Sequence, residues 1–530
     1  MKKHTLWGLL FSLAAGIVAA IPLMVDTLPL LSFVAFIPYF LYLYTREETE
    51  GYRFRYYASG LFFFFGYYAG AFSFFIAMYP LDFAGLGKFG SIAVIFAAMI
   101  LLPLFQAWFS AFAILILGVF RRRGFLRRPL FFALSLSALY TIFAFAQNFT
   151  WAGVPWANTA VGIASSPLLI QGASLLGSSF LVFFIIFVNA ALAEGFIRFR
   201  ECRDKEAILC FLAAIALFAS QILIGSVRLL LPEKEGKTMT VAMLQGNAPS
   251  TEGVDLYDHL YTCRDLAVAA AEEEEIDLML WSESVVTHDL RASKTLIAFF
   301  SNIAVRTGAT QAVGAFSAEP TETGDEGFYN ALFLFYPDGS MSEVTYKKQR
   351  PVPFGEYVPM AWLFETVLPS LTEISMLSRN TTAGSTPSLM TTDKGTLGGL
   401  ICFDSIYPKL ARESTKEGSE LFLLSTDDSW FDGSFGKSLH FRHAVLRAVE
   451  NGRTIVRTGN TGQSGIIDAK GNARDLLPLD TETYGIATVS LSEGKTLYTH
   501  IGDVTPYLSL GFLILVPLLS RKRKNETTKG

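Results

Sequence analysis

The chain has 530 residues, of which 51% are apolar and only 17% are charged, whereas an average soluble domain has about 25% charged residues. This composition excludes a disordered chain, a collagen and a coiled coil, and it predicts that part of the chain lies in a membrane. The formal net charge is −4. Nucleic-acid-binding proteins usually carry an excess of basic residues, so no nucleic-acid partner is expected. Four cysteines are too few for a disulfide scaffold in a chain of this length.

Long apolar runs fill the first 231 residues and are separated only by short charged breaks. A helix needs about 20 apolar residues to cross the hydrocarbon core of a bilayer. Burial inside a soluble core is an alternative for one such run, but eight of them disfavour it. The predicted spans are residues 6–24, 28–44, 57–79, 91–120, 129–147, 175–197 and 207–231, with an eighth at 504–520.

Cations gather in alternate connections between these spans. They lie within residues 2–3, 46–55, 121–128, 198–205 and 521–529, whereas the intervening short loops contain only Lys88. Because positively charged loops stay in the cytoplasm, we predict cytoplasmic termini and an extracytoplasmic or periplasmic segment at 232–502. The first run also resembles a signal peptide, but the second apolar run that follows it favours an uncleaved anchor.

The sequence therefore predicts a multi-pass α-helical membrane domain of seven helices at 1–231, a polar α/β domain at 232–502, and an eighth helix with a basic cytoplasmic tail at 503–530. In the polar part, residues 255–275 and 437–451 have helical spacing, and Pro337-Asp338-Gly339 predicts a hairpin turn. Several apolar strand runs are typical of a sheet covered on both faces. The predicted strands are residues 238–244, 276–281, 310–316, 330–336, 342–346, 397–402, 421–425, 454–457, 464–468 and 484–491.

Three reactive side chains follow apolar strands in the polar domain, namely Glu283, Lys348 and Cys402. Strand ends are where α/β sheets expose reactive groups. If the three converge, they supply a nucleophilic thiol, a base for its proton and a cation for an oxyanion. The alternative for a cysteine is packing as a small apolar side chain, which we expect of Cys210 and Cys263, while Cys202 belongs to a cytoplasmic loop.

Several longer strings surround these three residues, and the most specific of them is Val352-Pro353-Phe354-Gly355-Glu356. The others are Leu244-Gln245-Gly246-Asn247, Trp281-Ser282-Glu283, Ile401-Cys402, Asp428-Ser429-Trp430-Phe431, Glu450-Asn451-Gly452-Arg453 and Gly459-Asn460-Thr461-Gly462. With them, the polar domain resembles the carbon–nitrogen hydrolase (nitrilase) superfamily. With the seven preceding spans and the one that follows, the whole chain resembles the apolipoprotein N-acyltransferase family.

The resemblance implies an αββα sandwich with Cys402 as nucleophile, Glu283 as general base and Lys348 as the cation that stabilises the oxyanion. Lys347 is the rival for the lysine role, but Lys348 has the family's spacing of eight residues to Glu356. Glu356 would orient Lys348, and Asp404 would support the site. The chain departs from the family at Phe403-Asp404, where Tyr-Glu is usual, and at Asp427, where Asn is common.

The same resemblance implies that a fatty acyl group passes from a phospholipid, through a thioester, to the α-amine of the N-terminal S-diacylglyceryl-cysteine of an apolipoprotein, with no metal or organic cofactor. The expected location is the cytoplasmic (inner) membrane. One alternative is a membrane-tethered amidase or nitrilase. Another is a non-catalytic receptor or transporter with an outer ligand-binding domain. The absence of charged residues inside the predicted spans argues against an ion-coupled transporter.

Two further features carry weaker hypotheses. His440 and His443 lie three residues apart on a predicted helix, and without a third ligand we interpret them as packing or surface residues rather than a metal site or a partner of the cysteine. The apolar residues 358–377 predict either core packing or a lid that enters the bilayer.

The predicted orientation can be tested with a reporter that is active only in the cytoplasm. Fused after Leu231, the reporter should be silent, because the seventh span ends outside the cytoplasm in the predicted topology. The same reporter fused after Arg128 should be active. A strong signal from the Leu231 fusion would contradict the topology.

Overall fold

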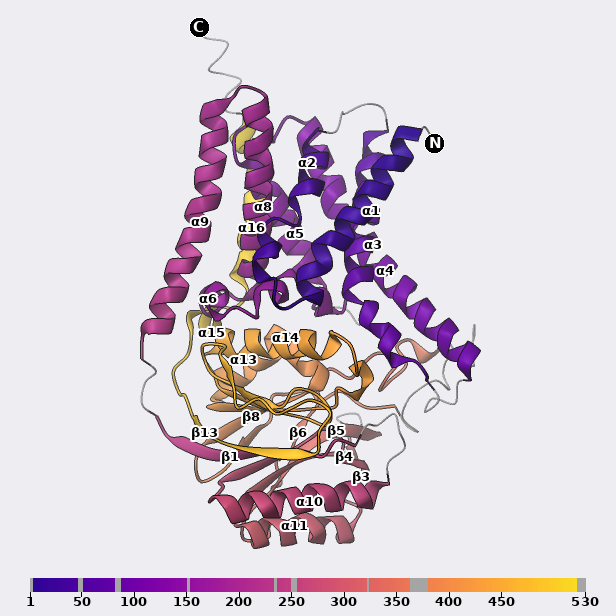
Figure 1. Cartoon of the computed structure of the whole chain (residues 1–530), viewed down its shortest axis with the longest axis vertical. Helices are drawn as coiled ribbons and strands as arrows, with labels where there is room; N and C mark the ends of the chain where they lie inside the picture. The colour runs from indigo at the N-terminus through magenta and orange to yellow at the C-terminus, as the bar shows by residue number, and fades with distance from the viewer. Residues whose placement is uncertain are drawn as a thin grey trace. The chain divides into compact units, whose positions relative to one another are not determined.

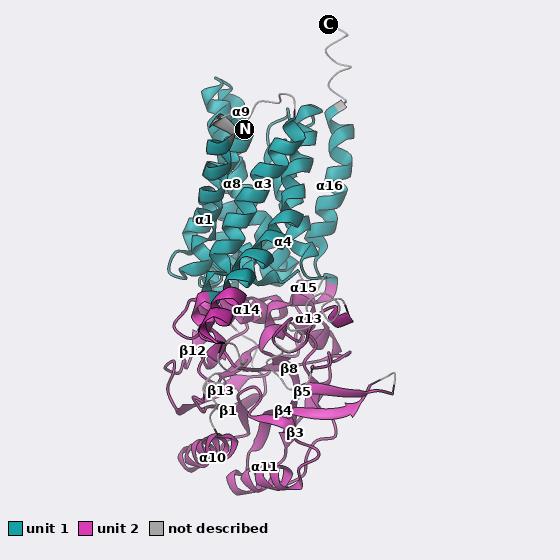
Figure 2. Ribbon diagram, turned by 90° about the vertical axis from the view of Figure 1, so that its right-hand side faces the viewer, with its two compact units in different colours: residues 1–75, 96–231, 501–530 teal, residues 76–95, 232–500 magenta. Residues whose placement is uncertain are grey.

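The computed structural model describes residues 3–45, 51–81, 87–149, 153–232, 236–248, 255–321, 324–362 and 380–521. They divide into two compact units, coloured separately in Figure 2. The first contains residues 1–75, 96–231 and 501–530, and the second contains residues 76–95 and 232–500. Residues 76–95 thus group with the polar segment, although the sequence places parts of them in predicted spans. The predicted division at 231 and 503 stays a prediction.

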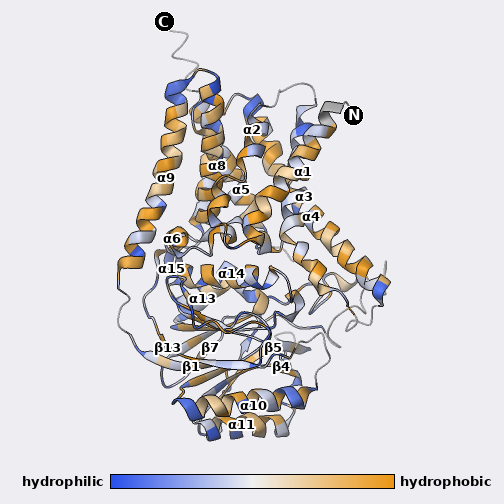
Figure 3. Ribbon diagram, viewed as in Figure 1, coloured by the Kyte–Doolittle hydropathy of each residue, from blue (hydrophilic) through white to orange (hydrophobic). Residues whose placement is uncertain are grey.

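The first unit is helical, and its helices are apolar along most of their length (Figure 3). Among the described residues, four helices are long and apolar enough to cross a membrane, namely residues 6–24 of α1 and the whole of α4, α8 and α9, and a bent pair of short helices would make five if it is one span. Three shorter apolar segments lie at residues 29–45, 131–146 and 504–520. The helices are α1 (Lys3–Met24), α2 (Ile37–Thr45), α3 (Tyr52–Ala71), α4 (Lys88–Arg122), α5 (Phe131–Ala146), α8 (Ser178–Arg200), α9 (Asp204–Leu230) and α16 (Val504–Arg521).

Helices α4 and α9 leave most of their apolar surface uncovered, since only 22% of the most hydrophobic window of each is buried, against 78% for α8. Side chains such as Phe96, Leu101 and Leu212 are more than half exposed. Such a large exposed apolar surface is stable when lipid covers it. The chain is therefore a membrane protein.

A broken segment that the sequence analysis missed precedes α8. The helical turns η4 (Pro155–Ala157) and η5 (Thr159–Ile163) are followed by α6 (Pro167–Ile170) and α7 (Ala173–Leu176), with a bend of 116° between the two halves. The segment contains Pro155, Pro167 and two glycines, and prolines and glycines interrupt helices. The sequence did not predict this segment as a span, because no single helix in it is longer than one or two turns.

A buried ion pair joins three helices of this unit. Glu194 and Arg198 are one turn apart on α8, fully buried, with their side chains 2.6 Å apart. Glu194 also accepts the backbone N–H groups of Leu130 and Ala133 at the start of α5, at 3.1 and 3.2 Å. Arg198 donates in turn to Glu206 on α9. The carboxylate thereby satisfies backbone donors at a helix start that would otherwise lack partners.

The described residues of the second unit form two sheets. The seven-stranded sheet has the order β13-β1-β2-β4-β5-β6, with β3 beside β4, and the six-stranded sheet has the order β12-β11-β10-β9-β8-β7. The first comprises β1 (Thr238–Gln245), β2 (Leu278–Trp281), β3 (Val286–Asp289), β4 (Thr310–Pro320), β5 (Glu326–Phe335), β6 (Tyr346–Lys347) and β13 (Thr483–Ser490). The second comprises β7 (Leu389–Thr391), β8 (Thr396–Ile401), β9 (Leu421–Thr426), β10 (Ile455–Gly459), β11 (Gly465–Ile467) and β12 (Ala473–Arg474).

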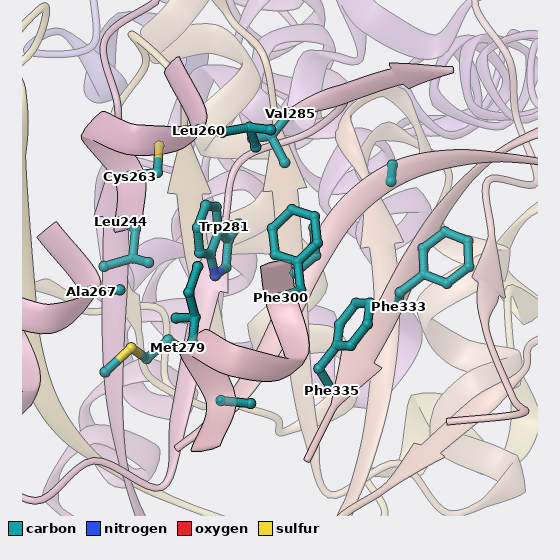
Figure 4. Packing of buried hydrophobic residues seen from close by; sticks show 14 of the residues in the cluster. Leu244, Leu260, Cys263, Ala267, Met279, Trp281, Val285, Phe300, Phe333 and Phe335 are labelled. Atoms are coloured by element: carbon teal, nitrogen blue, oxygen red, sulfur yellow. The ribbon is translucent and has the colours of Figure 1, made fainter. Parts of the chain in front are cut away.

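Two apolar cores make this unit an αββα sandwich, as the sequence predicts. One core lies between the seven-stranded sheet and the helices α10 (Leu256–Glu273) and α11 (Lys294–Thr307), and it includes Trp281, Phe300 and Phe333 (Figure 4). The other lies between the two sheets and includes Tyr346 and Ile401. Helices α13 (Pro408–Glu417) and α14 (Gly436–Asn451) cover the other face of the six-stranded sheet (Figure 1).

The inner strands of both sheets are parallel. β1, β2 and β4 run parallel in one sheet, and β8, β9 and β10 run parallel in the other. The predicted hairpin is confirmed, because β5 pairs antiparallel with β6 and Leu332 faces Tyr346. Parallel strands bring their carboxyl ends to one edge of a sheet, and this places the side chains considered next.

Candidate active site

Glu283, Lys348 and Cys402 each follow the end of a strand, and the structure brings them together. Glu283 comes two residues after β2, while Lys348 and Cys402 directly follow β6 and β8. The two sheets meet closely here, because the Ser425 hydroxyl on β9 donates to the Trp281 carbonyl on β2 at 3.0 Å. Gly399 contributes to this approach, since a Cβ there would lie 2.3 Å from the ring of Tyr346. Without a side chain at 399, β8 and the end of β6 can pack together.

Lys348 lies between two carboxylates. Its ammonium nitrogen is 2.9 Å from Glu283 Oε1 and 2.9 Å from Glu356 Oε2, and its side chain is only 2% exposed. Burial by itself would lower the pKa of Lys348, but the charges of Glu283 and Glu356 outweigh it and raise that pKa well above its usual range. The lysine is therefore a permanent cation.

Three donors hold the Glu283 carboxylate. Lys348 and the Asn330 side-chain amide, at 2.8 Å, both donate to Oε1, and the backbone N–H of Asp427 donates to Oε2 at 2.9 Å. Asn330 also reaches Glu356 at 3.1 Å, so it fixes the two carboxylates relative to each other. The contact from Asp427 comes from its backbone, so it does not depend on whether Asp or Asn occupies that position.

Cys402 adopts an unusual backbone conformation, with φ of +46°. Its side chain is close enough to Glu283 and Lys348 for both charges to act on the thiol. Burial raises the pKa of the Cys402 thiol well above its usual range, Glu283 raises it further, and Lys348 opposes this. The resting group is therefore a thiol, which needs a base before it can act as a nucleophile.

Asp404 connects the segment after Cys402 with the segment after Lys348. One carboxylate oxygen accepts from the Tyr346 hydroxyl at 2.8 Å and the Ile401 N–H at 3.2 Å. The other accepts from the backbone N–H groups of Gln349 and Arg350 at 3.2 and 2.8 Å. Burial raises the pKa of Asp404 to about 6, although Lys348 and the hydroxyl of Tyr346 oppose the rise. Phe403 beside it packs on Tyr407.

The side chain of Lys347 projects away from Glu283, on the opposite side of the strand from that of Lys348. Its ammonium nitrogen lies 2.7 Å from Glu319 and 4.2 Å from the centre of the Tyr329 ring. Adjacent strand residues project to opposite faces. The structure thus places Lys348, not Lys347, beside Glu283.

Three residues near the cysteine, His440, Asp428 and Asn330, were not predicted from the sequence to belong to the site. His440, which was interpreted as a packing or surface residue, is fully buried and lies 3.0 Å from the carbonyl oxygen of Cys402. Asp428 binds the other ring nitrogen of His440, and Asn330 holds the two carboxylates. Asp428 belongs to one of the strings that resemble the family, but its distance in the sequence from His440 does not indicate a contact between the two side chains. His443 is also buried.

The other predictions for this unit have mixed outcomes. Cys263 packs in the core beneath α10, as expected. Among the described residues, no cluster of His, Cys, Asp or Glu has the form of a metal site. Most of the segment 358–377 lies outside the described residues, so its role as a lid or as core stays a prediction.

Comparisons with known proteins agree on both parts of the chain. Residues 240–498 match the family model of carbon-nitrogen hydrolases, and residues 15–191 match that of the apolipoprotein N-acyltransferase N-terminal domain. The chain is 30% identical to the apolipoprotein N-acyltransferase of Geobacter metallireducens, over 76% of this chain and 77% of that one. It is 27% identical to the one of Gloeobacter violaceus, over 97% and 94%. A crystal structure of the Saccharomyces cerevisiae nitrilase-superfamily protein Nit3 is also similar, at 19% identity and a TM-score of 0.37, over 54% of this chain and 97% of that one.

The bonds of Asp404 predict the effect of Asp404→Asn. An amide would turn two hydrogens toward groups that are themselves donors, so we expect the variant to lose about 1–3 kcal/mol of stability. Because burial raises this pKa to about 6, from the usual value of about 4 for an aspartate, the contribution of the carboxyl to stability is present below pH 4 and falls as the pH rises through 6. The variant should lose that pH dependence, which melting temperatures between pH 4 and 7 will measure.

Asp427→Asn is the control for this experiment, because Asp427 reaches Glu283 through its backbone N–H. It should keep the pH dependence and change the melting temperature less. Equal stability of Asp404→Asn and the unaltered chain over the whole pH range would contradict the role given to Asp404.

Proposed function

The chain belongs to the apolipoprotein N-acyltransferase family, and from this premise we propose that Cys402 carries the acyl group as a thioester between a phospholipid and the α-amine of the N-terminal S-diacylglyceryl-cysteine of an apolipoprotein. The observation that carries this proposal is the buried ammonium of Lys348, held between Glu283 and Glu356 beside the thiol. A thiol, a carboxylate and a fixed cation are the groups that acyl transfer requires.

In the first half-reaction, Glu283 removes the thiol proton as Cys402 Sγ attacks the ester carbonyl of the phospholipid. The negative charge that develops on the carbonyl oxygen is stabilised by Lys348. When the tetrahedral intermediate collapses, the C–O bond of the ester breaks, and the leaving alkoxide takes the proton back from Glu283. The products are a thioester on Cys402 and a lysophospholipid.

In the second half-reaction, the α-amine of the acceptor attacks the thioester carbonyl. Glu283 accepts a proton from the amine, Lys348 again stabilises the oxyanion, and the C–S bond breaks. The departing thiolate takes the proton, which restores the thiol and leaves an amide on the acceptor. Glu283 therefore acts as base and then acid in each half, and Lys348 keeps its charge throughout.

The location of the reaction is also part of the proposal. Both substrates carry fatty acyl chains, and the first unit provides the apolar helices that a membrane enzyme needs. The cation pattern supports cytoplasmic termini and an extracytoplasmic site. The proposed partners are thus a phospholipid donor and a diacylglyceryl-modified apolipoprotein acceptor.

The hypothesis of a hydrolysing amidase differs only in the second acceptor, because water would replace the amine. A receptor or transporter would have no use for a thiol beside a held carboxylate and a buried cation. Both alternatives give distinct outcomes in the first experiment below.

Cys402→Ser should abolish transfer, because the hydroxyl is a far weaker nucleophile beside this carboxylate. Intact-protein mass spectrometry after incubation with phospholipid should detect one fatty-acyl adduct on Cys402 of the unaltered chain and none on the variant. The adduct should pass to a diacylglyceryl peptide with a free amine much faster than to water. Loss to water at an equal rate would favour the amidase, and full N-acylation by Cys402→Ser would exclude the proposed nucleophile.

The roles of Glu283 and Lys348 can be separated by single-turnover thioester formation. Glu283→Gln should block it, because no group then takes the thiol proton. Lys348→Met should slow both half-reactions by about 10²–10³, the usual cost of one oxyanion donor. Lys347→Met is the matched control and should change little, since Lys347 binds Glu319. A normal rate for Lys348→Met with an inactive but folded Lys347→Met would assign the cation to Lys347.

A further inference from the structure

A buried chain of polar groups lies behind Cys402, separate from Glu283 and Lys348. Arg457 on β10 donates to Asp428 Oδ2 at 2.6 Å, and Asp428 Oδ1 lies 2.7 Å from His440 Nδ1 on α14. His440 Nε2 then lies 3.0 Å from the carbonyl oxygen of Cys402. The side chains of Arg457, Asp428 and His440 are almost completely buried, so solvent does not compete for these hydrogen bonds.

Both ring nitrogens of His440 face oxygen acceptors. Asp428 can only accept at Nδ1, because the neighbouring Arg457 lowers the pKa of its carboxyl in spite of burial. The carbonyl of Cys402 can only accept at Nε2. A neutral imidazole has one N–H and one lone pair, so either neutral form would direct a lone pair at an oxygen. A ring that carries both protons satisfies both contacts.

The surrounding donors agree with this assignment. The Ser405 hydroxyl donates its hydrogen to the Cys402 carbonyl at 2.8 Å. Its oxygen, 3.0 Å from His440 Nε2, is then left to accept. Arg457 Nη2 lies 3.3 Å from His440 Nδ1, but its shorter contact at 2.6 Å is with Asp428. One carboxylate therefore accepts from two neighbouring cations.

Asp428 also reaches the thiol side of Cys402. The Thr426 hydroxyl donates to Asp428 Oδ1 at 3.1 Å and lies beside the Cys402 side chain. The charged groups that act on the thiol are Glu283, Lys348 and Asp428, of which only Lys348 is positive. A protonated His440 would add a further positive charge beside that of Arg457.

We propose that His440 is a positioning residue that acts as an imidazolium: it holds the Cys402 carbonyl, keeps the cysteine in its left-handed backbone conformation, and favours formation of the thiolate. This proposal rests on the proposed role of Cys402 as nucleophile. In this proposal two cations assist the nucleophile. His440 acts on Cys402 through its backbone carbonyl, whereas Lys348 acts on the oxyanion of the substrate.

The first test measures alkylation of Cys402 by iodoacetamide as a function of pH, in the full chain with Cys202, Cys210 and Cys263 replaced by alanine. His440→Gln is neutral, so we expect its alkylation profile to move to higher pH by about one unit, a tenfold lower rate at a fixed pH below the plateau. Thioester formation should slow by a similar factor with an unchanged KM for the phospholipid. His443→Gln, on the same helix, is the matched control and should leave the profile in place.

The second test needs no altered site residue. In the unaltered chain labelled with ¹⁵N-histidine, both ring nitrogens of His440 should be bonded to hydrogen at neutral pH. The signal is assigned by its loss in His440→Gln or, if that variant does not fold, in a chain whose five other histidines are glutamine. A ring nitrogen without hydrogen, or an unchanged alkylation profile in folded His440→Gln, would overturn the proposal.

These outcomes are distinct from a failure of the proposed function. If Cys402→Ser still transfers the acyl group, the nucleophile is wrong while the ¹⁵N result for His440 stands by itself. If Cys402→Ser is inactive but the His440 profile does not move, only the role of His440 is wrong.

Discussion

The burial of one lysine between two glutamates is the interaction on which the site depends. Glu283 follows β2, whereas Lys348 and Glu356 both follow β6, and each of the three would be costly to bury alone. Together they neutralise much of their charge, and Asn330 bridges the two carboxylates. Removing one partner of a buried ion pair typically costs about 3–5 kcal/mol. The same contacts that the proposed reaction uses therefore also hold the ends of β2 and β6 in place.

The sandwich supplies the positions that this interaction needs. Parallel strands deliver Glu283 and Cys402 at their carboxyl ends, one from each sheet. The hairpin of β5 and β6 brings Lys348 between them, and Asp404 binds the backbone that follows the lysine. In the proposed mechanism, the Cys402 thiol, whose pKa is raised, stays inert until Glu283 takes its proton. The proposed nucleophile is thus protonated at rest, and the carboxylate and the ammonium beside it are fixed by their hydrogen bonds.

Much of the fold could be predicted from the sequence, because long apolar runs, strand runs and the turn at 337–339 are local signals. The three reactive side chains each follow an apolar strand, which alone is a weak signal, and the surrounding strings that resemble the family singled them out. Asn330, Asp428 and His440 could not, because their contacts join residues 12 to 47 positions apart. The broken segment at 155–176 was not predicted because its helices are too short to form a long apolar run. Helix α13 was not predicted because part of its buried face is polar, with Ser414 and Thr415. Helix α11 was overlooked although Leu296, Phe300 and Ile303 give it an apolar stripe at helical spacing.

The most direct test of the central claim is a structure of the unaltered chain trapped with the acyl group on the enzyme. The account predicts a thioester on Cys402 Sγ, with the carbonyl oxygen within hydrogen-bonding distance of Lys348 Nζ and with Glu283 beside the sulfur. An acyl group on another residue, or a thioester whose carbonyl oxygen points away from Lys348, would contradict it.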